Sequence, residues 1–317
     1  MVSGASERAA NRGNPPVGRF AALREAVWPK LPVWRRLDLL TLLMIAYSTA
    51  VVVAVKYPGV DVPQLGSPFT VLNGIVLGLL LSFRNAAAYD RWWEGRKLWG
   101  QLVNDSRNIC LKVRALPGLT QEERAGVGKL VAGFAVGLKN HLRGAGKLQD
   151  VPGFEGDGHH PLHVPNHLAG ELLGTLQAWR RAGRITDFDL LLMDPHARAF
   201  MDVCGACERI KSTPAPKSYR SLVRHGLVLY LATAPWLIAR DVGFLTGMVV
   251  AILTYFLLGV ELTAEDVEEP FGRDADDLAL TAICETIRKS VMQTLGVSLI
   301  PTPSSLPLYA AAAKPTG

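Results

Sequence analysis

The sequence has few cysteines and no clear strand pattern. Only 4 cysteines occur in 317 residues. They are Cys110, Cys204, Cys207 and Cys284. This spacing does not indicate a secreted disulfide scaffold, and we expect Cys204 and Cys207 to be a packing pair within one helix. No stretch alternates convincingly between polar and apolar residues, so the fold class is predicted to be all-α.

Common enzyme signatures are also missing. The chain contains no Ser-His-Asp order, no His-Glu-x-x-His segment and no glycine-rich phosphate loop. These patterns supply the nucleophile, the zinc ligands or the phosphate cradle in large enzyme classes. We therefore predict that the protein is not an enzyme, with a membrane enzyme or an inert scaffold as the alternatives from a different class.

The positive charge is spread along the chain rather than gathered into one stripe. Lys and Arg number 34 against 28 Asp and Glu, for a formal net charge of +6 at pH 7. A nucleic-acid interface needs a basic patch, whereas several of these cations flank apolar runs. We expect no nucleic-acid partner. With 49% hydrophobic and 20% charged residues, the composition suits a membrane part joined to a soluble part.

The two ends differ from the rest of the chain. Residues 1–27 are polar and rich in Gly and Pro, without the apolar run that follows the start of a signal peptide. Residues 300–317 are low in complexity. Both segments are predicted to be disordered, which leaves 28–299 as the folded domain.

Four apolar stretches are predicted to cross a membrane. They cover about 37–55, 68–90, 222–240 and 243–260. A span needs roughly 20 apolar residues. The third stretch is short and contains Pro235, so we expect it to borrow length from 219–226. A tight turn at 240–243 leads into the fourth.

Basic residues give the orientation. Arg35 and Arg36 precede the first span, Arg84 and Arg91 follow the core of the second, and Arg220 and Arg224 precede the third. Lys56 alone lies in the short connection between spans one and two. The positive-inside tendency therefore predicts a multi-pass protein of the cell (inner or plasma) membrane with both termini in the cytoplasm.

Helices are also predicted outside the membrane, over 91–215 and 274–296. Thr120 to Glu123 reads as a capping box, and Thr186 is a candidate cap for a helix that runs to about Lys211. The second cytoplasmic region has an apolar residue at every third or fourth position. These residues are Leu280, Ile283, Ile287, Val291 and Leu295. Such spacing is typical of a helix that buries one face.

Two stripes run side by side along the second span. Ile75, Leu79 and Phe83 repeat every four residues, and Gly74, Gly78 and Ser82 do so one position earlier. Small residues at this spacing let helices approach closely in lipid. The bulky stripe beside them would then project into whatever the helices surround. This pattern predicts a pore-lining helix, and one helix encloses no pore, so a cyclic oligomer is required.

Three separated motifs resemble one protein family. The first is Ser82-Phe83-Arg84-Asn85 followed by 89–96, the second is Cys207-Glu208-Arg209 with 213–216, and the third is 268–272 with Asp276-Asp277-Leu278. Together they resemble the bacterial bestrophin homologues, over about 28–299. The resemblance implies a homopentamer in membrane lipid that conducts small inorganic ions through one central pore, with chloride as the default ion.

The same resemblance implies two constrictions. A hydrophobic neck would consist of Ile75, Leu79 and Phe83, which are the residues of the bulky stripe. Residues 183–187 match the segment that precedes the cytoplasmic aperture residue in bacterial members, which makes Phe188 the candidate. An apolar ring gates by dewetting. An aromatic ring offers its edge to an anion or its face to a cation, so a cation-selective sodium or potassium channel of the same architecture is the alternative.

One histidine cluster and one acidic cluster are further candidate ion sites. His159, His160, His163 and His167 lie in a loop rich in Gly and Pro without regular ligand spacing, so a solvated loop without metal or cofactor is predicted. The acidic cluster after the fourth span comprises Glu268, Glu269, Asp274, Asp276 and Asp277. Animal bestrophins bind calcium in a denser run here. Arg273 and Ala275 interrupt this one and it lacks the EF-hand pattern, so solvation is favoured over calcium.

Overall fold

The computed structural model describes residues 32–56 and 67–299, and every regular element within these ranges is a helix. The long helices are α2 (Pro32–Lys56), α3 (Ser67–Ala115), α4 (Gln121–Leu142), α5 (Val164–Arg181), α6 (Asp187–Ser212), α7 (Lys217–Val242), α8 (Thr246–Val267) and α9 (Leu280–Leu295). Two short 3-10 helices, η1 (Leu148–Asp150) and η2 (Gly243–Leu245), complete the list. The all-α prediction is confirmed over these residues. The two segments predicted to be disordered lie outside them.

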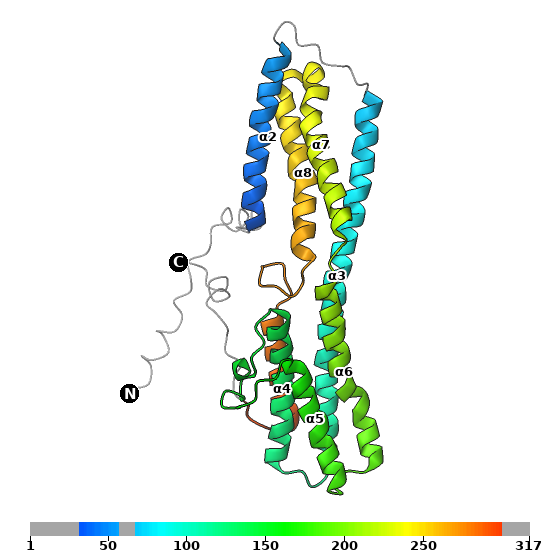
Figure 1. The fold of residues 1–317 in the computed structure, drawn as a ribbon, viewed down its shortest axis with the longest axis vertical. Helices are drawn as coiled ribbons and strands as arrows, with labels where there is room; N and C mark the ends of the chain where they lie inside the picture. The colour runs from blue at the N-terminus through cyan, green and yellow to red at the C-terminus, as the bar shows by residue number, and fades with distance from the viewer. Residues whose placement is uncertain (1–31, 57–66, 300–317) are drawn as a thin grey trace, which may run out of the picture.

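The molecule is elongated and has two halves stacked along its long axis (Figure 1). The upper half contains α2, α7, α8 and the first part of α3, and the lower half contains α4, α5, α6, α9 and the rest of α3. Helix α3 has 49 residues, which corresponds to about 73 Å at 1.5 Å per residue. It is the one described helix that belongs to both halves.

Three helical stretches are long and apolar enough to cross a membrane, 35–56, 71–115 and 217–267, and the second of them continues into the lower half. The last contains both α7 and α8, which η2 joins into a hairpin (Figure 1). Gly243 opens this turn with φ of +55°, a value that favours glycine. Helix α7 begins at Lys217 and keeps Pro235 in its interior, so the third stretch does borrow its first turns from the polar residues before it.

Helix α8 runs further than the sequence indicated, to Val267 instead of about 260. Its last turns carry Glu261 and Glu265, which pair with Arg224 of α7 at 3.2 and 2.8 Å. The sequence predicted an end near 260 because charged residues begin there. In the structure these carboxylates pair with Arg224, and α8 continues to Val267.

The lower half has one continuous apolar core. Trp99 of α3, Phe134 of α4, Leu172 of α5, Phe200 of α6 and Ile287 of α9 are all buried in it. Thr120 forms the predicted capping box at the start of α4, and the predicted cap Thr186 forms a second box with Asp189 at the start of α6. All four cysteines are buried and unpaired, which agrees with a packing role.

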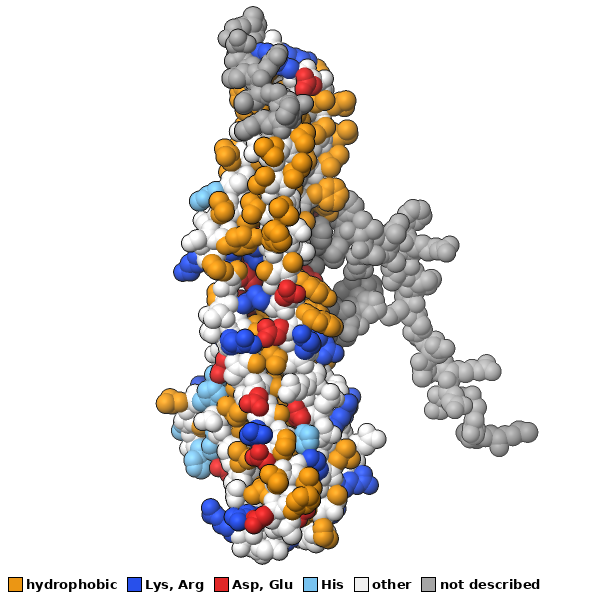
Figure 2. Space-filling view, turned by 90° about the vertical axis from the view of Figure 1, so that its right-hand side faces the viewer, with side chains coloured by type: hydrophobic (Ala, Val, Ile, Leu, Met, Phe, Trp, Pro, Cys, Tyr) orange, Lys and Arg blue, Asp and Glu red, His pale blue; other side chains and the backbone are white. Residues whose placement is uncertain are grey.

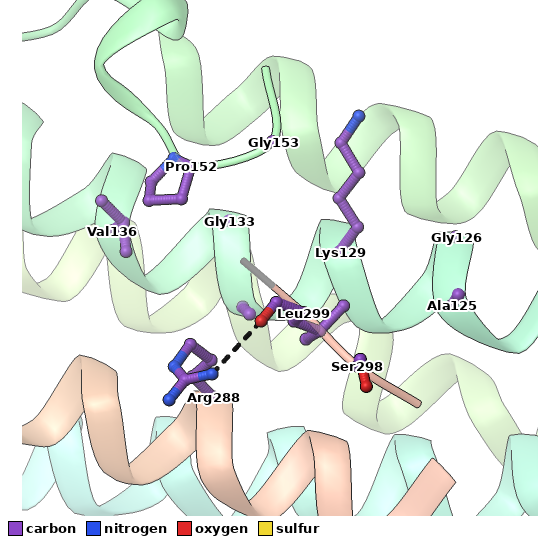
Figure 3. Close-up of a pocket in the computed structure, with 11 residues that line it drawn as sticks. Ala125, Gly126, Lys129, Gly133, Val136, Pro152, Gly153, Arg288, Ser298 and Leu299 are labelled. Carbon is purple, nitrogen blue, oxygen red and sulfur yellow. Dashed lines mark hydrogen bonds between the residues drawn. The ribbon is translucent and has the colours of Figure 1, made fainter. Parts of the chain in front are cut away.

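The two halves also differ in the side chains that they expose. Hydrophobic side chains cover most of the visible upper half, whereas Lys, Arg, Asp, Glu and His are scattered over the lower half (Figure 2). Exposed apolar residues occur on every upper helix, for example Leu42, Leu72, Leu229 and Phe256. Such a surface is stable in lipid and unfavourable in water.

Candidate functional site

Helix α3 has two different apolar faces in its upper part. Leu77 and Leu81 are 5% and 3% exposed because they pack against Val223 and Leu227 of α7. The bulky stripe predicted to line a pore lies on another face. Its members are exposed in the single chain: Ile75 63%, Leu79 55% and Phe83 59%. The sequence stripe is therefore one apolar face that makes little contact with the rest of its own chain.

The members of the small-residue stripe, Gly74, Gly78 and Ser82, differ in their surroundings. A Cβ atom at Gly74 would lie 3.5 Å from the Tyr230 hydroxyl of α7, whereas one at Gly78 would meet nothing within 4 Å. Ser82 is exposed as well. Gly74 therefore lies beside α7 at an ordinary contact distance, and the lower members of the stripe face outward beside the bulky one.

A buried arginine lies immediately below the bulky stripe. Arg84 is 0% exposed, and its Nη2 donates to Glu268 Oε2 over 2.5 Å. Its Nε lies 3.7 Å from Glu261 Oε2. Two buried carboxylates thus face one buried guanidinium. Breaking such a pair is costly because it leaves an uncompensated charge in a site without water.

Glu268 connects this arginine to three other parts of the chain. Its Oε1 accepts the backbone N–H of Ala215 over 2.7 Å, and its carbonyl oxygen accepts Arg91 Nε over 3.1 Å. Arg220 lies 3.9 Å from Oε2. Helix α3, the link before α7 and the end of α8 therefore meet at one carboxylate. Sequence reasoning noted these residues as motif and topology signals and missed the contact.

Arg91 fastens α3 to the end of α6. Its Nη2 donates to the carbonyl oxygen of Ile210 over 2.6 Å, and its Nη1 donates to that of Thr213. The last carbonyl groups of a helix lack intrahelical partners and carry partial negative charge, so a cation there is favourable. Burial is the main cause that lowers the pKa of Arg91, and the nearby Arg84 adds to it against the opposing carboxylates.

Phe188 lies far from the bulky stripe. It is the second residue of α6 and is 67% exposed. The start of α6 is tied to the lower end of α3, where Lys112 Nζ donates to the carbonyl oxygen of Leu192. From Phe83 to Lys112, α3 rises about 44 Å. The structure therefore keeps the two predicted constrictions as separate exposed sites at different heights.

The five residues of the acidic cluster do not converge. Glu268 belongs to the Arg84 site, and Glu269, Asp274 and Asp276 are exposed. Asp277 is partly buried, and its Oδ2 accepts the backbone N–H of Asp274 over 2.5 Å. Burial, together with the charge of Asp274, raises the pKa of Asp277 to about 6. This geometry gives no support to calcium binding, and the interpretation as a solvated cluster stays a prediction.

One metal-compatible set of side chains is present that the sequence analysis did not find. Within 32–56 and 67–299, His141, His163 and Glu208 are the one group of three or more His, Cys, Asp or Glu whose donor atoms lie close enough to hold an ion. Only His163 comes from the histidine-rich loop. No sequence signal joins it to His141 and Glu208, which lie on other helices.

Comparison with known proteins identifies the family. A family profile of bacterial and fungal bestrophin proteins matches residues 22–293. A voltage-dependent anion channel-forming protein of Nostoc sp. is 34% identical over 73% of this chain and 78% of its own. Another protein of that name, from Mesorhizobium japonicum, is 31% identical over 79% of this chain and 82% of its own.

Solved structures agree on the fold. The crystal structure of a bestrophin homologue from Klebsiella pneumoniae is similar with a TM-score of 0.73 and 24% identity, and the match covers 81% of this chain and 98% of that one. A variant of that homologue gives a TM-score of 0.75 at 25% identity, covering 82% and 99% of the two chains. The resemblance read from the sequence motifs is confirmed: this chain belongs to the bacterial bestrophin family of multi-pass membrane proteins.

Proposed function

We propose that this chain forms an anion-conducting channel in the cell membrane as a ring of five copies. Its relatives are named for forming voltage-dependent anion channels, and the family match spans nearly all described residues. In the proposed topology α2, upper α3, α7 and α8 are four spans. Arg35, Arg91 and Arg224 all stand at the ends of these helices nearest the lower half, which favours a cytoplasmic lower half and cytoplasmic termini.

The exposed bulky stripe is the observation that carries the proposal. Ile75, Leu79 and Phe83 stand outward on one face of α3 while the opposite face is packed against α7. Cyclic symmetry would bring five such faces around one axis. The result is a dry constriction that excludes ions until it widens and fills with water. The ring edge of Phe83, which carries partial positive charge, suits an anion.

Phe188 would form a second ring at the cytoplasmic mouth. It is fully separate from the neck and held at the first turn of a capped helix, so its position is well defined. A ring at the mouth would act on ions in series with the neck, at a different point along the same path. Phe188→Ala is therefore expected to change conductance or ion selectivity without opening the closed neck.

The decisive experiment measures the reversal potential of the purified protein in a planar bilayer under a potassium chloride gradient. A shift toward the chloride equilibrium potential supports the proposal. A shift toward the potassium potential would keep the neck and overturn anion selectivity, and no current from a folded pentamer would overturn the channel itself. The oligomer is counted by mass measurement in the same detergent.

The neck is tested by a triple variant with a matched control. Replacing Ile75, Leu79 and Phe83 by Ala should give a leaky pore with a higher open probability. Val228 and Leu229 of α7 are exposed to a similar degree, 66% and 67%, on a surface we assign to lipid. Replacing these two by Ala should leave gating as it is. An unchanged open probability in the triple variant would remove the neck assignment.

A further inference from the structure

Three side chains from three helices meet in the lower half, away from the proposed pore residues. His141 lies in the last turn of α4, His163 is the N-cap residue of α5, and Glu208 lies in the last turns of α6. We propose that His141, His163 and Glu208 bind a divalent transition-metal ion of the zinc class. The site is independent of the proposed channel activity.

The distances suit a small ion. His141 Nε2 lies 2.6 Å from Glu208 Oε1, and His163 Nε2 lies 2.8 Å from the same oxygen. All three donor atoms lie within 4.8 Å of one another. Zinc bonds of roughly 2.0–2.2 Å in a tetrahedron place ligand atoms about 3.4 Å apart. Widening of the two contacts by under about 1 Å therefore makes room for the ion.

The donor set and its exposure also fit. Two imidazoles and one carboxylate are ligands that zinc takes in proteins, with water in the remaining position. The side chains are 28%, 33% and 37% exposed for His141, His163 and Glu208. An ion and its water can reach them from solvent, while the supporting helices hold the ligands in place. The His141 and His163 rings lie 4.4 Å apart between centroids.

Glu208 contributes a carboxylate to the proposed site. Burial acts to raise the pKa of Glu208, but hydrogen bonds from His163 and His141 outweigh it and leave this pKa below its usual value. Cys204 lies one turn earlier on α6. Its sulfur does not belong to the group of donor atoms that lie within 4.8 Å of one another, so the site consists of the other three side chains.

Metal binding must move a proton within the His163 ring. The backbone N–H of Asn166 donates to His163 Nδ1 over 3.1 Å, which leaves the proton of the neutral ring on Nε2. A ligating histidine carries its proton on the other nitrogen. The Nε2 proton therefore moves to Nδ1 when the ion binds at Nε2, and the ring then gives up its bond from Asn166. Binding is expected to weaken as pH falls, because protons compete with the ion for the imidazole nitrogens.

The chain offers matched variants for the test. His163→Asn keeps a side-chain acceptor for the N-cap bond, since Asn is a preferred cap residue, but removes the Nε2 ligand. Glu208→Gln keeps an oxygen that accepts both imidazole N–H groups and removes the charge. The control replaces His159 and His167 by Ala, another histidine pair with ring centroids 5.8 Å apart. His159 lies in the histidine-rich segment before α5, and His167, which the sequence analysis placed in the same loop, lies in the first turn of α5.

The full-length protein in detergent is titrated with Co²⁺ by visible absorption and with Zn²⁺ by calorimetry. We expect one ion per chain with a tetrahedral cobalt spectrum, and an affinity at least about 100-fold lower in His163→Asn and Glu208→Gln, because loss of a ligand costs more than loss of its supporting partner. The control should bind like the wild type. Elution as the same oligomer shows that the variants fold.

Three outcomes would overturn the site. They are the absence of a tetrahedral cobalt spectrum, wild-type affinity in both ligand variants, and loss of binding in the His159/His167 control. A second readout is the unfolding temperature, which Zn²⁺ should raise in the wild type and the control but not in the ligand variants. None of these readings depends on ion conduction, so failure of the channel proposal would leave the result interpretable.

Discussion

The two halves of the molecule are stabilised in different ways. The lower half buries large side chains such as Trp99 and Phe134 in a core made by its own helices. Among the described residues, the upper half has two small buried clusters, around Leu77 and Val52, and many of its apolar side chains are exposed. At its lower end it contains a buried ion pair, Arg84 with Glu268.

This difference shows what each half needs from outside. The lower half gains its hydrophobic stabilisation on folding, as a water-soluble domain does. The upper half cannot do so, because lipid tails are as apolar as its side chains, and packing and polar contacts decide its structure. The lower half of a single chain therefore buries its own apolar core, whereas the upper half leaves apolar faces for lipid or other copies to cover. Substitutions that remove either a buried apolar side chain or a buried polar contact test this comparison.

The largest expected effect comes from the buried ion pair. Arg84→Met leaves the buried Glu268 and Glu261 with only the more exposed Arg220 and Arg224 as cations, so we expect the free energy of unfolding to fall by about 3–5 kcal/mol. Denaturant unfolding of the detergent-solubilised protein, followed by tryptophan fluorescence, measures it. The control is Arg209→Met, whose side chain is 65% exposed and pairs with Glu94 at 2.6 Å. This loss should be below about 1 kcal/mol. Equal losses would refute the special role of the buried pair.

The next effect compares two phenylalanines. Phe200 is 0% exposed and packs edge-on against Phe134 with 4.9 Å between ring centroids. Phe200→Ala should cost about 3–5 kcal/mol, because it removes a buried ring and leaves a cavity. Phe83→Ala, at 59% exposure, should cost less than about 1 kcal/mol while altering gating. Urea unfolding of both variants measures these two losses of unfolding free energy. A larger loss for Phe83→Ala than for Phe200→Ala would show that Phe83 of the upper half stabilises the assembly.

A smaller effect concerns pH at the junction of the halves. The pKa of Asp277 is about 6 in the folded chain, above roughly 3.9 in an unfolded one. The folded state therefore holds this proton more tightly, and the resulting stability is complete below pH 4 and lost as pH rises through 6. After allowance for the partial exposure of Asp277, we expect this contribution to the free energy of unfolding at low pH to be about 1–2 kcal/mol.

The carboxamide variant isolates that contribution. Asp277→Asn keeps an oxygen that accepts the N–H of Asp274 but no longer titrates. Its unfolding free energy should depend less on pH between 4 and 6 than that of the wild type. Asp276→Asn, at an exposed neighbour, should follow the wild-type curve. Parallel curves for the wild type and Asp277→Asn would show that Asp277 titrates as an ordinary surface carboxyl.

The smallest effect is local. Thr186 Oγ1 accepts the N–H of Asp189 over 3.1 Å, and Asp189 Oδ2 accepts the N–H of Thr186 over 2.9 Å. Thr186→Ala removes this cap, so amide exchange in the first turn of α6 should speed up about fivefold. Thr186→Ser should restore it. Faster exchange throughout the lower half would mean that the cap supports the whole core.

Elements that depend on nearby residues could be predicted from the sequence. Both capping boxes span only four residues, Thr120 to Glu123 and Thr186 to Asp189, so each signal is local. The bulky stripe on α3 needed only the four-residue spacing of Ile75, Leu79 and Phe83. The structure confirms that these three share an exposed face. Their role in a pore stays a prediction, because it depends on other copies of the chain.

Contacts between distant segments were missed for the opposite reason. Arg84 and Glu268 are 184 positions apart, and His141 and Glu208 are 67 apart. Periodicity reports which face of a helix is buried and not which residue on another helix meets it. The tryptophans show the same limit, since Trp99 is buried in the lower core whereas Trp92 donates to the carbonyl oxygen of Asp276.

The burial of every native cysteine has a practical consequence for labelling. Burial raises the pKa of Cys110, Cys207 and Cys284 to about 12, as it does for Cys204. The thiolate is the reactive form, so these four should be inert to polar thiol reagents in the folded chain. The natural protein thus serves as its own unreactive background. A single cysteine introduced at Leu79 would report when water reaches that depth of the assembly, without any prior removal of native thiols.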